Sequence, residues 1–249
     1  MPQVALVTGG AIRIGCAIAL KLAQSGYAVA IQYNNSKDEA QRTVEIIRAA
    51  GGVSECFRAD LKEIAALEGL VSETEAAFGA ISCLVNNASM FQDDSFQTMS
   101  PGGWDAHMAV NLRAPLFLAQ AVARGLPADS KGDIINLIDQ RVLRPNPMFF
   151  SYTVAKSALW AATQTMAQAL APRLRVNAIG PGPVLKSVHQ TDEEFAHECA
   201  SMPLGHGTTP EEIAGAALFI LNAPAMTGQM ITLDGGQHLL WQTPDLRVT

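Results

Sequence analysis

The sequence predicts an α/β protein built on one doubly wound sheet of about seven parallel strands, with helices on both faces. Short apolar runs that suit strands alternate with amphipathic stretches of helical length. The predicted strands contain few polar residues, which is typical of strands covered on both faces. No linker, repeat or low-complexity stretch divides the chain, so residues 1–249 are expected to form a single domain.

The first four predicted strands each precede a helix. The strands are Val4–Thr8, Tyr27–Tyr33, Ser54–Ala59 and Ile81–Val85. The helices that follow them are Ile14–Ser25, a helix from Ser36 to near Gly51, Ile64–Phe78 and Trp104–Gly125. Gly26 ends the first helix, and Ser36 with Glu39 predicts a capping box at the start of the second.

The second half of the chain continues the alternation with three further strands. These strands are Asp133–Ile138, Arg175–Ile179 and Met230–Leu233, and the helices are Tyr152–Leu170 and Glu211–Leu221. The region 181–210 has no clear periodicity and is rich in Pro, Gly, Ser, Thr and His. A long irregular segment inside a compact domain is usually functional, so we expect a substrate lid there.

Composition excludes several classes of function. The formal net charge of −6 argues against a nucleic-acid partner. No run of 18 apolar residues predicts a membrane span, and no basic n-region precedes the first strand. The four cysteines are scattered, with no Cys-x-x-Cys, which indicates free thiols in a reducing compartment and no metal site. These observations favour a cytoplasmic globular protein without a nucleic-acid or membrane partner.

A glycine-rich turn, Thr8–Gly15, lies between the first strand and the first helix. This context is the one that a dinucleotide site requires. Gly9 permits a sharp turn, Gly15 allows the helix to pack close to the sheet, and the helix N-terminus presents free N–H groups to a pyrophosphate. Arg13 is either a solvated surface residue or a ligand whose guanidinium faces the pyrophosphate and the substrate.

The end of the second strand distinguishes NAD from NADP. An acid there would accept from the ribose 2′-hydroxyl and repel a 2′-phosphate. Asn34, Asn35, Ser36 and Lys37 are neutral or basic, and the first acid is Asp38. We therefore predict NADP(H), with Asn34, Asn35 and Ser36 near the phosphate. Ser36 can serve as a helix cap as well.

Tyr152 and Lys156 are four residues apart and share one face of a predicted helix. A nearby ammonium is expected to lower the phenol pKa from its ordinary value near 10. Asp139 ends a strand 13 residues earlier, at the edge where open α/β sheets bind ligands. A carboxylate can accept hydrogen bonds from the ring N–H and amino groups of a heterocycle. It is less well suited to a ketone, whose oxygen needs a hydrogen-bond donor. Alternatively, Asp139 caps the next loop or pairs with Arg141.

Together with Asn86–Ser89, these motifs resemble the short-chain dehydrogenase/reductase family over nearly the whole chain. That family usually has Gly at the position of Arg13 and Ser at the position of Asp139. The combination of Arg and Asp resembles the pteridine reductases. The resemblance implies a Rossmann-type domain, usually in a homotetramer.

The resemblance also implies roles for individual residues. Further cofactor contacts are expected from Ile14, Asp60, Leu61, Asn87, Ala88, Ser89, Tyr152, Lys156, Pro181 and Gly182. The substrate is expected to contact Arg13, Ser89, Phe91, Asp139 and Tyr152, with Phe91 stacking on a pterin unless it only packs against the lid. Asn111 is expected to hold a water for proton relay, unless it is a satisfied polar residue in a core helix. The threonine usual after Pro181-Gly182 is missing.

We therefore predict an NADPH-dependent reductase that transfers a hydride to a dihydropterin or dihydrofolate-like substrate, with Tyr152, Lys156, Asp139 and Asn111 in catalytic roles. The leading alternative is a carbonyl reductase of the same family, acting on a 3-oxoacyl thioester or a sugar ketone. A second alternative is a non-catalytic NADP-binding sensor.

Overall fold

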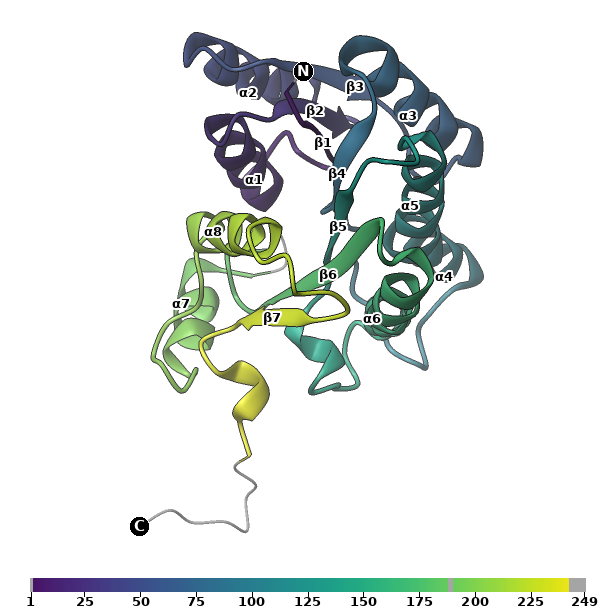
Figure 1. Cartoon of the computed structure of the whole chain (residues 1–249). Helices are drawn as coiled ribbons and strands as arrows, with labels where there is room; N and C mark the ends of the chain where they lie inside the picture. Colours follow the sequence, from purple (N-terminus) through teal and green to yellow (C-terminus); the bar gives the residue numbers. More distant parts are fainter. Residues whose placement is uncertain (1, 188–189, 242–249) are drawn as a thin grey trace.

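The computed structural model describes residues 2–187 and 190–241 and contains one seven-stranded sheet with the order β3-β2-β1-β4-β5-β6-β7 (Figure 1). The strands are β1 (Val4–Val7), β2 (Ala28–Tyr33), β3 (Ser54–Arg58), β4 (Ile81–Asn86), β5 (Gly132–Leu137), β6 (Leu174–Pro181) and β7 (Met230–Leu233). All neighbouring strands pair in parallel. The predicted doubly wound sheet is confirmed.

Helices cover both faces of the sheet. They are α1 (Arg13–Gln24), α2 (Lys37–Ala49), α3 (Ile64–Phe78), α4 (Pro101–Met108), α5 (Ala114–Gly125), α6 (Phe150–Leu170), α7 (Asp192–Ala200) and α8 (Pro210–Leu221), with short turns η1 (Ala109–Arg113), η2 (Gln140–Val142) and η3 (Gln237–Leu239). Figure 1 shows α1, α2 and α8 on one side of the sheet and α3, α5 and α6 on the other.

The central strand β1 contributes to the core on both of its faces. Ala5 and Val7 pack in the cluster that includes α1 and α8, whereas Leu6 packs in the cluster that includes α3 and α5. Alternate residues point to opposite faces of a strand, which explains this division. The strand order reverses at β1, because β2 lies on one side of it and β4 on the other. Open α/β sheets bind ligands beyond the carboxyl ends of the strands at such a point.

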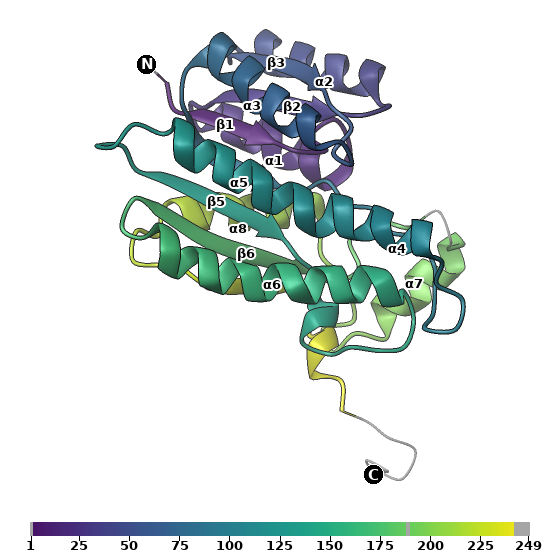
Figure 2. The ribbon, with the colours of Figure 1, turned by 90° about the vertical axis from the view of Figure 1, so that its right-hand side faces the viewer.

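The prediction of a single regular helix over Trp104–Gly125 is wrong in two respects: the helix begins earlier, and it is interrupted. The helix begins at Pro101, because the Ser100 hydroxyl caps it by accepting from Gly103 N at 3.1 Å. A five-residue π-helical turn, η1, separates α4 from α5. Pro115 follows this turn and cannot donate the hydrogen bond that a regular helix needs there, so the wider turn accommodates it. Figure 2 shows α4 and α5 running in line beside α6.

Two local predictions also need correction. Ser36 lies at the N-cap of α2, but its side chain makes no capping hydrogen bond, and Glu39 instead pairs with Arg42 at 3.2 Å. The predicted lid is not wholly irregular, since it contains α7, which begins with a capping box between Thr191 and Glu194. Residues 188–189 of that region lie outside the described residues.

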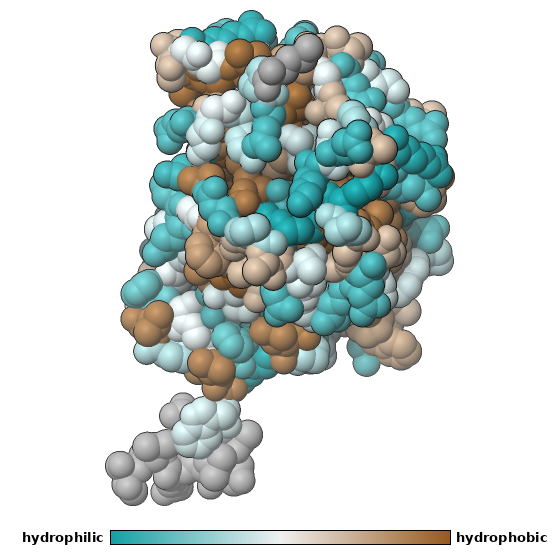
Figure 3. Space-filling view, viewed as in Figure 1, coloured by the Kyte–Doolittle hydropathy of each residue, from teal (hydrophilic) through white to brown (hydrophobic). Residues whose placement is uncertain are grey.

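The described residues include no helix that is both long and apolar enough to cross a membrane. Figure 3 shows hydrophilic and hydrophobic residues interspersed on the face seen in Figure 1. Within residues 2–187 and 190–241, no group of three or more His, Cys, Asp and Glu side chains is arranged to hold a metal ion.

Candidate active site

The turn after β1 depends on two glycines. Gly9 has a φ of +60°, in the left-handed region that favours glycine. A Cβ on Gly15 would lie 2.1 Å from the Gly9 carbonyl oxygen and 2.5 Å from Asn87 Nδ2. No side chain fits in that space, so helix α1 begins directly against the turn. Arg13 also has a positive φ, +55°, at the position where the family usually has Gly.

Hydrogen bonds fasten the turn to the end of β4. The Thr8 hydroxyl accepts from the backbone N–H groups of Asn87 and Ala88, both at 3.0 Å. Asn87 Nδ2 donates to the carbonyls of Thr8 at 2.9 Å and Gly9 at 3.1 Å. These bonds join the two strands at which the order of the sheet reverses, and they fix the shape of the crevice between them.

Gln32 is a buried polar residue of the site that the sequence analysis missed. Its Oε1 accepts from Gly9 N at 2.8 Å, and its Nε2 donates to the Ala59 carbonyl at 2.8 Å. It therefore links the ends of β1, β2 and β3. A lone amide within the apolar run of β2 was the available signal, because buried polar groups need partners.

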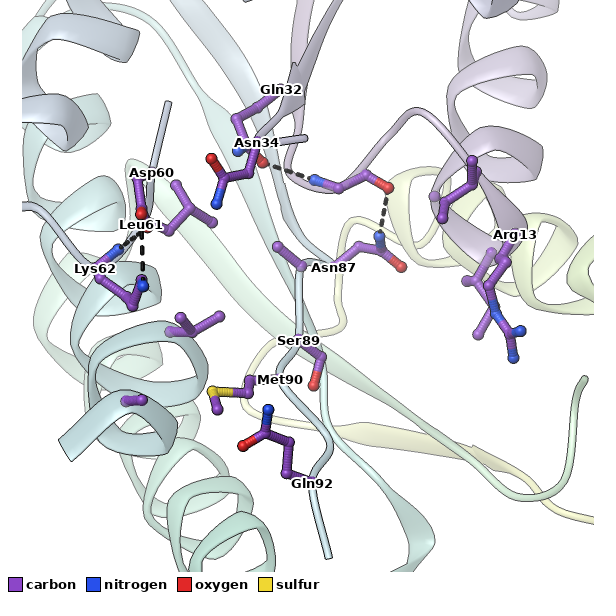
Figure 4. A pocket seen from close by; sticks show the side chains of 17 residues that line it. Arg13, Gln32, Asn34, Asp60, Leu61, Lys62, Asn87, Ser89, Met90 and Gln92 are labelled. Carbon is purple, nitrogen blue, oxygen red and sulfur yellow. Dashed lines mark hydrogen bonds and ion pairs between the residues drawn. The ribbon is translucent and has the colours of Figure 1, made fainter. Parts of the chain in front are cut away.

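A pocket of about 550 Å³ lies over this turn (Figure 4). Figure 4 shows Asp60 and Lys62 on one side of the pocket and Arg13 on the other. Of the predicted site residues, the pocket is lined by Gly9, Arg13, Ile14, Asn34, Asp60, Leu61, Asn87, Ala88 and Ser89. Asn35 and Ser36 are not part of its lining. Further lining residues that the sequence analysis did not select include Gln32, Lys62, Met90 and Gln92.

A basic residue, Arg58, contacts the pocket residue Asn34. The Asn34 carbonyl accepts from Arg58 Nε at 3.3 Å, although neither Arg58 nor Lys37 is itself part of the pocket lining. Arg58 ends β3 and is paired with Tyr33 in the sheet. Among the described residues, neither Lys37 nor Arg58 forms an ion pair with a carboxylate. The sequence analysis missed Arg58, because strand pairing rather than proximity in sequence brings it to Asn34.

Tyr152 and Asp139 meet at the carboxyl end of β5. The Tyr152 hydroxyl donates to Asp139 Oδ2 at 2.8 Å, and Asp139 Oδ1 accepts from Arg141 N at 2.8 Å. The carboxylate thus caps the start of η2, as the alternative interpretation of Asp139 expected, and it also contacts the candidate proton donor. Tyr152 and Lys156 lie on α6 and are both buried.

Burial controls the protonation of this cluster. It raises the pKa of Tyr152 well above its ordinary value, and the neighbouring Asp139 carboxylate raises it further. The expectation that Lys156 would lower the Tyr152 pKa is therefore not met in this state. Burial also raises the pKa of Asp139 and lowers that of Lys156 to about 8. Lys156 Nζ donates to the Leu137 carbonyl at 2.6 Å and lies 5.7 Å from the centre of the Tyr152 ring.

Asn111 lies in η1 and is fully buried. Its Oδ1 accepts from Met90 N at 2.8 Å and from the Ser89 hydroxyl at 3.2 Å, while its Nδ2 donates to the Met90 carbonyl at 2.8 Å. The side chain therefore holds the loop after β4 in place. This is the satisfied polar residue that the sequence analysis gave as the alternative to a role in proton relay.

Phe91, two residues beyond Ser89, lies against the candidate proton donor. Its ring is edge-on to Tyr152 with centroids 4.8 Å apart, and it stacks on Phe149 at 4.1 Å. Sequence reasoning did not select Phe149, which lies at the N-cap of α6.

Arg13 and the Pro181-Gly182 turn bring the predicted lid to the site. Arg13 is a lining residue of the pocket, and its guanidinium donates to the carbonyls of Leu185 at 3.0 Å and Lys186 at 3.1 Å. Pro181 is the last residue of β6, and Gly182 N donates to the Leu233 carbonyl at 2.9 Å. The first residues of the lid are thus anchored both to the sheet and to the glycine-rich turn.

Comparisons with known proteins agree with this geometry. Residues 10–238 match the family described as "Enoyl-(Acyl carrier protein) reductase". The chain is 46% identical to FolM alternative dihydrofolate reductase 1 from Brucella suis, solved in complex with NADP; the match covers 98% of each chain with a TM-score of 0.95. It is 32% identical to the 3-oxoacyl-[acyl-carrier-protein] reductase FabG of Staphylococcus epidermidis, over 96% of this chain and 100% of that protein.

A short-chain dehydrogenase from Burkholderia cenocepacia, solved in complex with NADP, is 32% identical with a TM-score of 0.88, and the match covers 94% of this chain and 97% of that chain. The matched segment includes the glycine-rich turn from Gly10 onward, the Tyr152 and Lys156 pair and every strand except β1. The chain therefore belongs to the short-chain dehydrogenase/reductase family of oxidoreductases.

Proposed function

We propose that this protein is an NADPH-dependent reductase of a dihydropterin or dihydrofolate-like substrate. The observation that carries the proposal is the hydrogen bond of 2.8 Å from the Tyr152 hydroxyl to Asp139, at the position where the family usually has a serine. Arg13 at the glycine-rich turn and Phe91 beside Tyr152 add a cation and a flat apolar surface. The 46% identity to an alternative dihydrofolate reductase supports the same substrate class.

The residues of the pocket fit a dinucleotide with a 2′-phosphate. Gly9 and Gly15 allow the turn and the N-terminus of α1 to pack closely, and the free N–H groups of that N-terminus would hold a pyrophosphate. Arg58 and Lys37, without carboxylate partners among the described residues, would hold the phosphate near Asn34. Lys156 would contact the nicotinamide ribose. When bound, the reduced cofactor supplies the hydride.

The chain's own groups would orient the substrate and supply the proton. Phe91 would stack against a flat ring. Asp139 would accept hydrogen bonds from ring N–H or amino groups, and Arg13 would contact both substrate and cofactor. The raised pKa of Tyr152 keeps its hydroxyl protonated near neutral pH, as a general acid requires. Asp139 holds that proton at the site through its hydrogen bond with Tyr152.

A 3-oxoacyl thioester is the second candidate substrate, favoured by the FabG relatives at 32% identity. A ketone oxygen needs a donor, and an ionised carboxylate at position 139 offers none. The acids at the start of α7 also argue against an acidic carrier protein as partner. The non-catalytic alternative would bind NADPH but reduce neither kind of substrate.

The substrate is tested with Asp139→Ser. NADPH oxidation is measured with dihydrobiopterin, dihydromonapterin, dihydrofolate and an acetoacetyl thioester. We expect pterin reduction to fall by on the order of 10²-fold, the scale of a lost acid/base group, while thioester reduction holds or rises. Asp139→Asn, which keeps the shape and removes the charge, is the matched control. Loss of thioester activity with unchanged pterin activity would overturn the proposal.

Cofactor choice is tested at the end of β2. We expect the parent enzyme to prefer NADPH and Asn34→Asp to shift the preference toward NADH, because the new carboxylate repels the 2′-phosphate. Arg58→Gln should raise the KM for NADPH and leave that for NADH nearly unchanged. Equal kcat/KM for the two cofactors in the parent enzyme would contradict this part of the proposal.

We propose a homotetramer, as the family resemblance implies, and a location in the cytoplasm, as the scattered free cysteines indicate. Large apolar side chains on outer helices support association: Phe117 of α5 is 44% exposed and Phe219 of α8 is 57% exposed. Light scattering on the purified protein tests the tetramer.

A further inference from the structure

Arg141 carries a charge that the described part of the chain balances only in part, through Asp139: burial raises the pKa of Asp139, and the Arg141 charge opposes that rise. Arg141 lies in η2, two residues after Asp139. Its guanidinium has one hydrogen bond to the described protein, from Nη1 to Asn146 Oδ1 at 3.1 Å, and it forms no ion pair there. Most of its five donors therefore remain available to a ligand.

The guanidinium is nevertheless held in place. It lies over the Phe149 ring, 5.1 Å from the ring centre, in a cation–π contact. Asn146, its hydrogen-bond partner, lies between Pro145 and Pro147, which restrict the backbone of the loop. An arginine fixed in this way loses little further freedom when it binds, and its fork of donors matches a carboxylate.

A series of aromatic contacts connects Arg141 to the reacting end of the site. The Phe149 ring stacks on Phe91 with centroids 4.1 Å apart, and Phe91 is edge-on to Tyr152. Two stacked rings, Phe149 and Phe91, thus lie between Arg141 and the proton donor Tyr152. A flat substrate at Phe91 and Tyr152 would reach Arg141 only with a tail that extends past the Phe149 ring.

We propose that Arg141 forms a second substrate subsite, which binds a carboxylate on the tail of the ring substrate. The inference rests on the proposed function and narrows it, because it favours pterins with an acidic tail over pterins with a neutral one. The chain has a net charge of −6, so an anionic substrate needs a local cation of this kind at the mouth of the site.

Arg141→Gln tests the subsite, with dihydrofolate as the acidic substrate and dihydrobiopterin as the neutral one. We expect the KM for dihydrofolate to rise about 10-fold to 100-fold, which corresponds to a lost charge-assisted hydrogen bond, while both constants for dihydrobiopterin stay within about twofold. Arg141→Lys, which keeps the charge without the fork, should lie between the parent and the Gln variant. Arg144→Gln is the matched control, since this exposed arginine of the same loop donates to the Gln237 carbonyl at 3.4 Å.

A binding measurement without turnover accompanies the kinetics. Calorimetry should show folate bound more weakly by the Arg141→Gln variant and biopterin bound equally by variant and parent. Equal losses for both ligands would mean that Arg141 acts through Asp139, and no change would mean that it is only a surface residue; either result overturns the subsite. A parent enzyme that reduces neither pterin would overturn the proposed function as well.

Discussion

Two residues set this chain apart from the usual pattern of its family, and both lie at the candidate active site. Arg13 replaces a glycine and keeps a positive φ of +55°, so the chain retains the backbone conformation and adds a cation that reaches the lid. Asp139 replaces a serine and accepts the hydrogen bond of Tyr152. The side chain at position 139 therefore accepts hydrogen bonds, whereas the usual serine donates one to a ketone. This difference is the physical basis for proposing a heterocyclic substrate.

The pH dependence of activity is expected to reflect Lys156. Burial lowers its pKa to about 8, so the free enzyme loses this charge as the pH rises through 8. Because the charge would hold the cofactor ribose, kcat/KM should fall above about pH 8, and a pH–rate profile measures this. Lys156→Arg should move the basic limb upward, since arginine stays charged throughout the range. If the basic limb of the pH–rate profile stayed at pH 8 in both the parent and the Lys156→Arg variant, the titration would belong to another group.

At the scale of elements, helix α6 begins without a cap of its own. Its N-cap residue, Phe149, has a φ of +53° and makes no capping hydrogen bond. Asp94, from the loop after β4, supplies the missing acceptors: its Oδ1 accepts from Ser151 N at 3.0 Å and its carbonyl from Phe150 N at 3.2 Å. The loop that carries Phe91 is therefore fixed to the helix that carries the proton donor.

Removal of this cap should affect substrate binding more than the chemical step. We expect Asp94→Ala to lower the free energy of unfolding by about 1 kcal/mol and to raise the KM of a ring substrate, because Phe91 is no longer held against α6. Asp94→Asn keeps an acceptor and should restore most of the KM. Asp93→Ala, a change at an exposed neighbour, is the control. A lower kcat with unchanged KM would contradict this role. Thermal unfolding and steady-state kinetics measure both effects.

At the scale of the whole molecule, Arg175 joins the later part of the sheet to helix α8. It forms an ion pair with Asp133 of β5 at 2.5 Å. Its guanidinium also donates to four carbonyls at and beyond the C-terminal end of α8, those of Ile220, Leu221, Ala223 and Met226. One side chain thus adds donors at the helix end, where the carbonyls of Ile220, Ala223 and Met226 also accept from Ala223 N, Met226 N and Asn177 Nδ2.

Arg175→Met should destabilise the fold by on the order of 3 kcal/mol, because it leaves the half-buried Asp133 carboxylate without its ion-pair partner and removes four hydrogen bonds to the end of α8. Asp133→Asn should behave differently. Burial raises the pKa of Asp133 to about 6, so the folded state binds its proton more tightly than the unfolded state. This group therefore lowers stability as the pH rises from about 4 to 6, and the Asn variant should lose that dependence. Denaturant unfolding at pH 4 to 7 measures both variants; a parent whose stability does not depend on Asp133 in this range would contradict the second expectation.

The sequence by itself determined the architecture and the chemical character of the site. The parallel sheet was predictable from seven apolar runs, each of which is followed or preceded by a stretch of helical periodicity. Strands buried on both faces must be apolar. Gly9 and Gly15 were predictable because only residues without a side chain fit so sharp a turn. Asp139 could be located at a strand end by its spacing from Tyr152.

Tertiary structure alone decided the contacts between distant segments and the protonation of the buried groups. Gln32 and Asp94 act on residues 23 and 57 positions away in the chain, and no local pattern encodes such pairs. The raised pKa of Tyr152 follows from burial beside Asp139, which exists only after α6 has packed against β6 and η2. Local sequence sets backbone preference and polarity, whereas the dielectric surroundings of a side chain and its long-range partners come from the packed fold.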